Sequence, residues 1–184
     1  MIQVYTSITN NHDPPRDDIP VLGDTPYSKD CPLQLARLNK ALGPAIHFPE
    51  SEWTIWIDGN VFLNVSPEVL VKKCKDQPFG VFAHFHNNTL QEEAAAIKQA
   101  YPEHAAHCTC SPAYVTLPVA MTMVLVRRTC PEMLAASSEW WELMQTTKCY
   151  RDQMTFPRAF AHLGSYWPAV DFTKPNEFFT RIQA

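Results

Sequence analysis

The chain has 184 residues, of which 46% are apolar and 18% charged, and its formal net charge is -4. These values are typical of one globular domain over residues 1–184 with a real hydrophobic core, and they exclude an intrinsically disordered chain. An acidic chain is also not expected to coat nucleic acid or an anionic membrane surface.

The sequence contains no apolar run of about 18 residues, so we expect no integral membrane segment. Its first residues, Met-Ile-Gln-Val-Tyr-Thr, have neither the basic region nor the apolar region of a secretory signal. Six cysteines are scattered along the chain without the spacing of a small disulfide scaffold. We therefore predict a cytoplasmic protein with reduced thiols.

Predicted strands and helices alternate along the chain. An alternating first strand (2–8) is followed by a long loop with five prolines (9–32) and by a helix (33–42) that Gly43-Pro44 is expected to end. A strand then ends at Asp58. The remaining predicted helices are 66–75, 90–100, 131–144 and 150–161, and the remaining predicted strands are 79–86, 115–127 and 165–172. This order predicts an α/β domain with a mixed, mainly parallel central sheet.

Residues 53–60, Trp-Thr-Ile-Trp-Ile-Asp-Gly-Asn, are the most informative stretch. A buried strand would deliver the Asp58 carboxylate to its C-terminal end, where ligands bind in open α/β sheets. A carboxylate beside a second oxygen ligand, here Asn60, suits Mg²⁺ or Mn²⁺, and such a cation often bridges to phosphate. The alternative is that Asp58-Gly59-Asn60 forms the turn of a β-hairpin, and residues 53–60 alone do not decide between the two.

Other polar groups also lie where apolar elements end. They are His84 and His86, Arg127 and Arg128, and the run Arg151-Asp152-Gln153. Taken singly, each is more often structural than functional, but together they suit a site at one edge of a sheet. The sequence has no phosphate-binding Gly-x4-Gly-Lys loop, no Gly-x-Gly-x2-Gly motif and no Gly-x-Ser-x-Gly elbow.

The order of these motifs resembles a known family. Ile-Trp-Ile-Asp-Gly-Asn, Ala-His, Glu-Glu-Ala-x-Ala, Val-Arg-Arg, Trp-Trp-Glu and Arg-Asp-Gln-Met-Thr-Phe follow one another over nearly the whole chain. The pattern is similar to the glycosyltransferase-like domain family that includes plant proteins of mucilage biosynthesis and many bacterial and phage proteins. The resemblance implies a GT-A-type fold and a nucleotide-sugar donor.

The resemblance also implies roles for particular residues. Asp58 and Asn60 would stand where related enzymes have an Asp-x-Asp motif, and His162 would complete the shell of a Mn²⁺ or Mg²⁺ ion. Asp152 and Gln153 would lie at the reacting sugar, with Asp152 as the base if transfer inverts configuration. The expected donor contacts are Thr6, Arg37, Lys40, Asp58, Gly59, Asn60 and Arg127, and the expected sugar or acceptor contacts are His84, His86, Glu93, Trp141 and Arg151.

The predicted reaction moves a sugar from a nucleoside diphosphate to a hydroxyl. The acceptor could be a hydroxymethylated DNA base, a glycan or a small molecule, and the sequence pI of about 5.9 argues mildly against DNA. One alternative is an inactive module that binds nucleotide sugar or glycan. Another is a zinc-binding interaction protein built on residues 104–110, although their Cys-x-Cys spacing favours a loop with incidental thiols.

Overall fold

The computed structural model describes residues 1–9, 13, 15–23 and 32–182. Its strands are β1 (Ile2–Tyr5), β2 (Trp53–Ile57), β3 (Val61–Leu63), β4 (Phe79–Ala83), β5 (Ala120–Arg128), β6 (Ser165–Trp167) and β7 (Phe179–Arg181). Its helices are α1 (Pro32–His47), α2 (Pro67–Cys74), α3 (Leu90–Ala100), α4 (Pro102–Ala105), α5 (Pro131–Thr147) and α6 (Asp152–Phe160).

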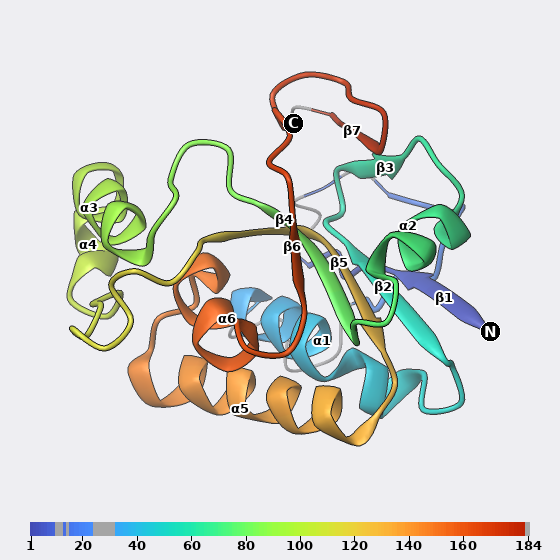
Figure 1. Cartoon of the computed structure of the whole chain (residues 1–184), viewed down its shortest axis with the longest axis horizontal. Coiled ribbons are helices and arrows are strands. Elements are labelled where there is room, and N and C mark those ends of the chain that lie inside the picture. Colours follow the sequence, from blue (N-terminus) through green and yellow to red (C-terminus); the bar gives the residue numbers. More distant parts are fainter. Residues whose placement is uncertain (10–12, 14, 24–31, 183–184) are drawn as a thin grey trace.

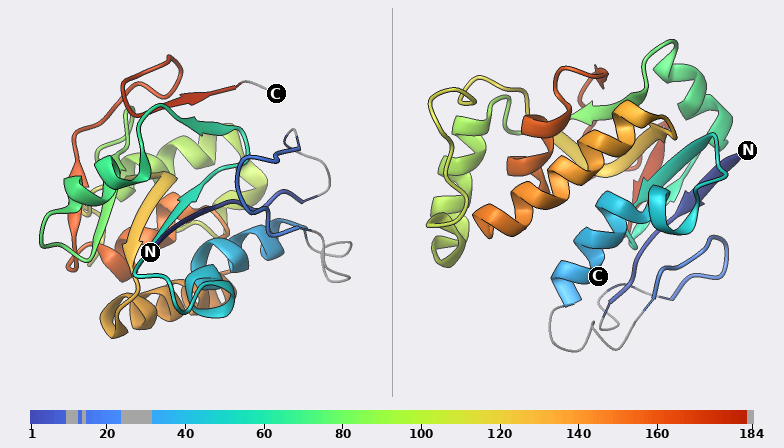
Figure 2. Two further views of the ribbon diagram at one scale, coloured as in Figure 1. Left: turned by 90° about the vertical axis from the view of Figure 1, so that its right-hand side faces the viewer. Right: turned by 90° about the horizontal axis from the view of Figure 1, so that it is seen from below.

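Five strands form a central sheet in the order β1-β2-β5-β4-β6. Helices α1, α5 and α6 cover one face and α2 lies on the other, as Figures 1 and 2 show. Because side chains alternate along a strand, Trp56 packs into the core under α1 and α5, whereas Ile55 and Ile57 pack into the core under α2. The sequence-based prediction of a mixed α/β sheet is confirmed.

The central strand β5 runs antiparallel to both of its neighbours. β1 pairs with β2 and β4 pairs with β6 in parallel, so four strands share one direction and β5 opposes them. The N-terminal half of β5 therefore lies beside the C-terminal ends of β2 and β4, with Asp58 N–H bonded to the carbonyl of Met123. The C-terminal residues of β5 lie at the opposite edge, where Arg128 is opposite Trp53.

The hairpin alternative for Asp58-Gly59-Asn60 is wrong. Strand β3 follows this turn but does not return along β2; it pairs antiparallel with β7 in a separate two-stranded sheet. Asp58 is thus left at the open carboxyl edge of β2.

The prediction that α1 ends at Gly43-Pro44 is also wrong, because the helix continues to His47. A Cβ at residue 43 would lie 2.8 Å from the Tyr5 ring, so glycine lets α1 approach β1 closely. Pro44 lacks the N–H that would bond to the carbonyl of Lys40. The guanidinium of Arg127 takes that place and donates to the same carbonyl at 2.6 Å.

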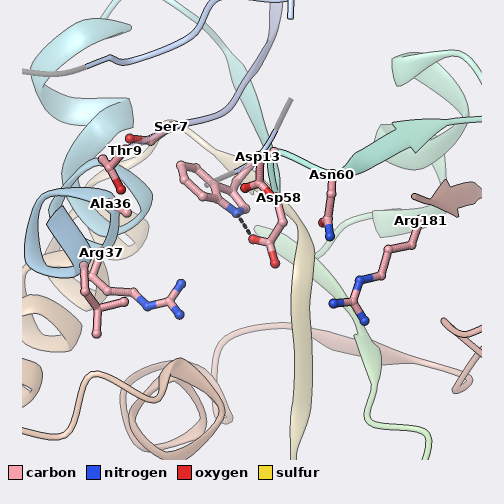
Figure 3. A pocket seen from close by; sticks show the side chains of 11 residues that line it. Ser7, Thr9, Asp13, Ala36, Arg37, Asp58, Asn60 and Arg181 are labelled. Atoms are coloured by element: carbon pink, nitrogen blue, oxygen red, sulfur yellow. Dashed lines mark hydrogen bonds between the residues drawn. The ribbon is translucent and has the colours of Figure 1, made fainter. Parts of the chain in front are cut away.

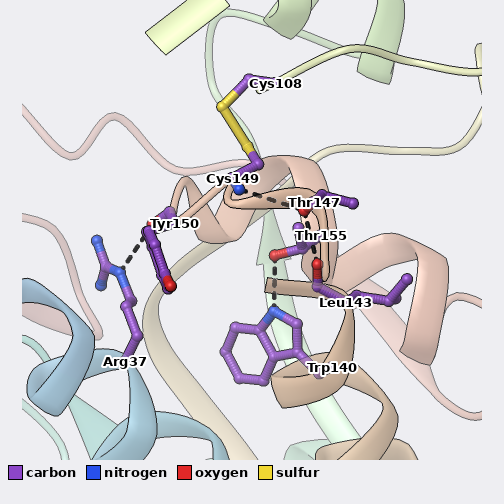
Figure 4. Close-up of a disulfide and its surroundings, with 8 residues drawn as sticks. All are labelled: Arg37, Cys108, Trp140, Leu143, Thr147, Cys149, Tyr150 and Thr155. Carbon is purple, nitrogen blue, oxygen red and sulfur yellow. Dashed lines mark hydrogen bonds between the residues drawn. A yellow bond between two sulfur atoms is a disulfide. The ribbon is translucent and has the colours of Figure 1, made fainter. Parts of the chain in front are cut away.

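The prediction of reduced, incidental thiols is wrong for two of the six cysteines. Cys108 and Cys149 form a disulfide that joins the loop after α4 to the segment between α5 and α6 (Figure 4). Cys74, Cys110 and Cys130 are free thiols, and Cys31 lies outside the described residues. The two partners are 41 residues apart, and no spacing rule in the sequence links them.

We expect loss of this disulfide to lower the free energy of unfolding by about 2–4 kcal/mol, because a cross-link of this length restricts the unfolded chain. Urea unfolding of Cys149→Ser and of wild type with and without a reducing agent measures the change. Cys110→Ser is the matched control and is expected to unfold like wild type. A wild-type midpoint that does not respond to reductant would contradict the linkage.

No helix among the described residues is both long enough and apolar enough to span a membrane.

Candidate active site

A pocket of about 430 Å³ opens at the carboxyl edge of β2 (Figure 3). Its walls come from the segment after β1, the first turns of α1, the turn between β2 and β3, and β7. The lining residues are Ser7, Thr9, Asp13, Leu33, Ala36, Arg37, Trp56, Asp58, Gly59, Asn60 and Arg181. Four of the residues predicted from the sequence, Arg37, Asp58, Gly59 and Asn60, therefore line one cavity.

Asp58 presents only part of its carboxylate to this pocket. One oxygen, Oδ1, accepts a hydrogen bond from the Trp56 indole at 2.8 Å and forms an ion pair with Lys40 Nζ at 3.1 Å. The side chain is 31% exposed, and its second oxygen lies on the pocket side of the bond to Trp56 (Figure 3). Gly59 lines the pocket beside it, and a Cβ there would come within 2.5 Å of an oxygen of Asp13.

Beneath the pocket floor, Lys40 joins the two carboxylates that the sequence singled out. Its ammonium lies 2.6 Å from Asp152 Oδ2 and 3.3 Å from Thr122 Oγ1, in addition to its contact with Asp58. Arg37 reaches the same Asp152 oxygen at 3.2 Å and donates from Nε to the carbonyl of Tyr150 (Figure 4). Helical spacing places Arg37 and Lys40 on one face of α1, as predicted.

The predicted role of Lys40 as a direct phosphate contact does not fit this geometry. Its side chain is completely buried, and its ammonium is surrounded by Asp58, Asp152 and Thr122. A buried ammonium is stable only when it is paired in this way. Lys40 therefore acts on the pocket indirectly, by fixing Asp58 and by its charge.

Asp152 is a poor candidate for the predicted catalytic base. Burial by itself raises the pKa of this carboxyl, but the charges of Arg37 and Lys40 and hydrogen bonds from Lys40 and Thr122 outweigh it and hold the pKa well below its usual range. A base works best when its pKa is near the working pH. Asp152 instead anchors the two cations of α1.

The depressed pKa of Asp152 predicts acid sensitivity. The unfolded chain binds a proton to this group near its ordinary pKa of about 3.9, whereas the folded protein does not. The ion pairs of Asp152 thus stabilise the fold fully above about pH 4, and this stabilisation is lost as the pH falls towards the folded-state pKa. Urea midpoints measured from pH 7 down to pH 3 should fall less steeply in Asp152→Asn than in wild type; equal slopes would contradict the assignment.

Arg127 does not line the pocket, contrary to the prediction that it binds the donor. It is completely buried beneath α1, where it donates to the carbonyls of Lys40 and Ala41, the hydroxyl of Tyr5 and the hydroxyl of Ser137. The physical reason is the direction of β5, whose end lies at the edge of the sheet away from Asp58. Arg127 fastens α1 to the sheet.

The structure also places several other predicted residues outside the pocket. Thr6 is buried in a bridge with Val21, and the half-buried Trp141 packs against the core under α5. Arg151 lies over the Tyr101 ring at 4.5 Å, and Gln153 is half-buried in the first turn of α6. His162 is exposed beyond the C-terminal end of α6, a helix of nine residues that starts at Asp152, so it does not complete a metal shell at Asp58.

His84, His86 and Glu93 form a separate group at the carboxyl end of β4. His84 Nδ1 accepts from the backbone N–H of Asn87 at 3.0 Å, and the Asn87 amide donates to the buried Glu93 at 2.7 Å. Burial lowers the pKa of His84, with opposition from Glu93 and a further lowering by His86. These side chains lie at the same edge of the sheet as Asp58 but do not line its pocket.

Sequence reasoning missed several residues of the site. Thr122 and Trp56 each lie within an apolar strand, and their inward direction becomes visible only when β2 and β5 are paired. Arg181 comes from β7, a segment without any motif, and reaches the pocket because β7 pairs with β3. A polar residue within an apolar run was the available signal for Thr122.

Cys108 is not available as a ligand in the zinc-binding alternative, because it is held in the disulfide. Within the part of the chain that the structure describes, no group of three or more His, Cys, Asp or Glu residues could hold a metal ion. The side chain of His104 lies outside that description.

Comparisons with known proteins do not assign a family. No family model matches the chain, and no curated protein matches it. One solved structure that matches is that of a glycosyltransferase involved in the glycosylation of the major capsid of PBCV-1. The match has a TM-score of 0.45 and 14% sequence identity, and it covers 91% of this chain and 80% of that one. A similarity this distant does not assign an activity to the chain.

Proposed function

We propose that the pocket binds a nucleotide sugar through its diphosphate and that the protein transfers the sugar to a hydroxyl acceptor. The observation that carries this proposal is the pair of arginines on either side of Asp58. Arg37 from α1 and Arg181 from β7 both line the pocket, and their guanidinium groups point inward from opposite walls (Figure 3). Two guanidinium groups facing one cavity suit the several oxygens of a diphosphate.

The residues present fit a divalent cation on that diphosphate. The pocket-facing oxygen of Asp58 and the amide oxygen of Asn60 are hard ligands, and Asp13 lines the same cavity. Mg²⁺ commonly uses one or two carboxylates together with substrate phosphates and waters, so this small set is sufficient. When bound, Mg²⁺ or Mn²⁺ would neutralise charge on the leaving diphosphate.

The chain's own groups would stabilise the same charge. Arg37 and Arg181 would bind phosphate oxygens, and Lys40 would add a fixed positive charge beneath Asp58. Because Lys40 and Arg37 share Asp152 as a partner, they are held in place before the substrate arrives. Such preorganised charges cost no reorganisation during the reaction, and this arrangement supports transfer rather than simple storage of a nucleotide.

The melting temperature of the purified protein tests donor binding. It would be measured against UDP, GDP, ADP, CMP and their sugars, each with and without Mn²⁺, because a ligand of the native state raises the melting temperature by mass action. A shift with one diphosphate, followed by release of that nucleotide from its sugar when acceptors are added, would support the proposal. No shift with any member of the panel would overturn it.

Arg181→Ala tests the two-arginine assignment. The exposed side chain of Arg181 contacts Phe172 and no core cluster contains it, so the fold should persist while the affinity for the diphosphate falls about tenfold or more. Calorimetric titration of the nucleotide measures the loss. Arg128→Ala, which removes an exposed arginine at the opposite edge of the sheet, should bind like wild type. Equal losses in the two variants would contradict the assignment.

A binding module without turnover is the second candidate. It is favoured by two observations: Lys40 already occupies the space between Asp58 and Asp152, and the depressed pKa of Asp152 makes it a weak base. Donor hydrolysis in a single turnover separates the two candidates, since only a transferase releases the nucleotide.

A further inference from the structure

Three aromatic side chains form a partly exposed surface beside the pocket, which we call the aromatic shelf: Phe85, His86 and Phe172. The His86 ring contacts Phe85 at 4.8 Å and Phe172 at 5.6 Å, both edge to face. Phe85 is 44% exposed and belongs to none of the three core clusters. The loop after β4 and the segment after β6 come together to form the shelf. Part of its aromatic surface is exposed and therefore open to a ligand.

The shelf adjoins the donor pocket through one residue. The Arg181 guanidinium lies 5.8 Å from the Phe172 ring and also lines the pocket of Asp58. The segment from β6 to β7 arches over the carboxyl edge of the sheet, so both features face the same side of the molecule (Figure 1). A ligand on the shelf would therefore lie next to a donor whose diphosphate is bound through Arg181.

The surroundings of the shelf suit an uncharged ligand. His84 lies at its base, where burial lowers its pKa and Nδ1 accepts from backbone N–H groups, so the neutral ring keeps its proton on Nε2 as a hydrogen-bond donor. The carboxylates near the shelf have polar partners: Asp171 contacts Lys174 at 3.4 Å, and Glu93 accepts a hydrogen bond from the neutral amide of Asn87. A nucleic-acid strand would need a row of lysines and arginines for its phosphates.

We propose that the aromatic shelf binds the acceptor and that the acceptor is a neutral glycan. Aromatic ring faces carry negative potential, and the C–H groups of a sugar ring, which are slightly positive, stack on them. The inference rests on the proposed function and deepens it by naming the acceptor class. In the transfer, the bond from the donor sugar's C1 to the diphosphate breaks, and its electron pair stays on the diphosphate. A bond forms from C1 to the acceptor oxygen, whose proton passes to water.

Ligand-observed saturation-transfer NMR tests the shelf. The probes are methyl α- and β-glycosides of glucose, galactose, mannose and xylose, with single-stranded oligothymidine for comparison. Wild type is expected to bind at least one glycoside, and Phe85→Ala should bind it about three- to tenfold more weakly. Ile46→Ala removes another exposed apolar side chain, at the far end of α1, and should leave glycoside binding unchanged.

The outcomes separate this inference from the proposed function. Nucleotide-dependent stabilisation without binding of any glycoside would overturn the glycan acceptor and leave the donor site standing. Salt-sensitive binding of oligothymidine that Phe85→Ala abolishes would assign the shelf to nucleic acid instead. Glycoside binding that survives Phe85→Ala unchanged would place the acceptor elsewhere. Glycoside binding lost in Phe85→Ala, in a protein that no nucleotide stabilises, would support the shelf and contradict the transferase.

Discussion

Lys40→Met is expected to lower the free energy of unfolding by about 3–5 kcal/mol, since it leaves a buried carboxylate without its nearest cation. Methionine keeps an unbranched stem of similar length, so the change removes mainly the charge. Asp152, which is almost completely buried, would lose its 2.6 Å contact and keep only Arg37 and Thr122. Urea unfolding followed by tryptophan fluorescence measures the loss.

A double-mutant cycle distinguishes this explanation from simple disruption of packing. Asp152→Asn removes the stranded charge while keeping an oxygen that can accept from Thr122 and Arg37. The double variant should therefore be more stable than the sum of the two single changes predicts, by about 1 kcal/mol or more. Strict additivity would mean that Lys40 and Asp152 do not interact as an ion pair, and it would contradict the arrangement at the pocket floor.

The elements that sequence patterns predicted well are those that depend on local signals. Helix α3 begins at the predicted residue because Thr89 and Glu92 form a capping box, and it ends at the predicted residue shortly before Pro102. Strand β2 and its terminal Asp58 follow from an apolar run that stops abruptly. The predicted end of α1 was wrong for a non-local reason. The helix continues through Pro44 with the help of Arg127, 83 positions later, which donates to the carbonyl of Lys40 that Pro44 leaves free.

In the candidate site, too, local patterns predicted some features and missed those that depend on burial and strand pairing. The order of motifs brought attention to Asp58, Arg37, Lys40 and Asp152, and the structure places their side chains in one network. The order of motifs could not show how deeply each side chain is buried. The predictions that Lys40 contacts phosphate and that Asp152 is a base followed from the resemblance. Because of the direction of β5, Arg127 lies away from the pocket. The pairing of β3 with β7 places Arg181 in the pocket lining. Neither strand pairing leaves a local mark in the sequence.

Asp58→Asn is expected to reduce sugar transfer by roughly 10²–10³-fold while leaving the fold intact. Asparagine keeps an oxygen in place of Oδ1, so it can still accept from the Trp56 indole and from Lys40. What it removes is the negative charge on the oxygen that faces the pocket, and with it the strongest ligand for a cation on the diphosphate. The rate of nucleotide release at saturating donor, measured across a range of Mn²⁺ concentrations, reports this loss.

The metal dependence of the Asp58→Asn variant gives the decisive comparison. If Asp58 holds the cation, the variant should need a higher Mn²⁺ concentration for half-maximal rate, whereas Asp76→Asn, an exposed change after α2 at the opposite edge of the sheet, should behave like wild type. An unchanged Mn²⁺ requirement with a reduced rate would mean that Asp58 acts through Lys40 and the shape of the pocket floor. A wild-type rate would remove Asp58 from the mechanism and leave the two arginines to bind the diphosphate alone.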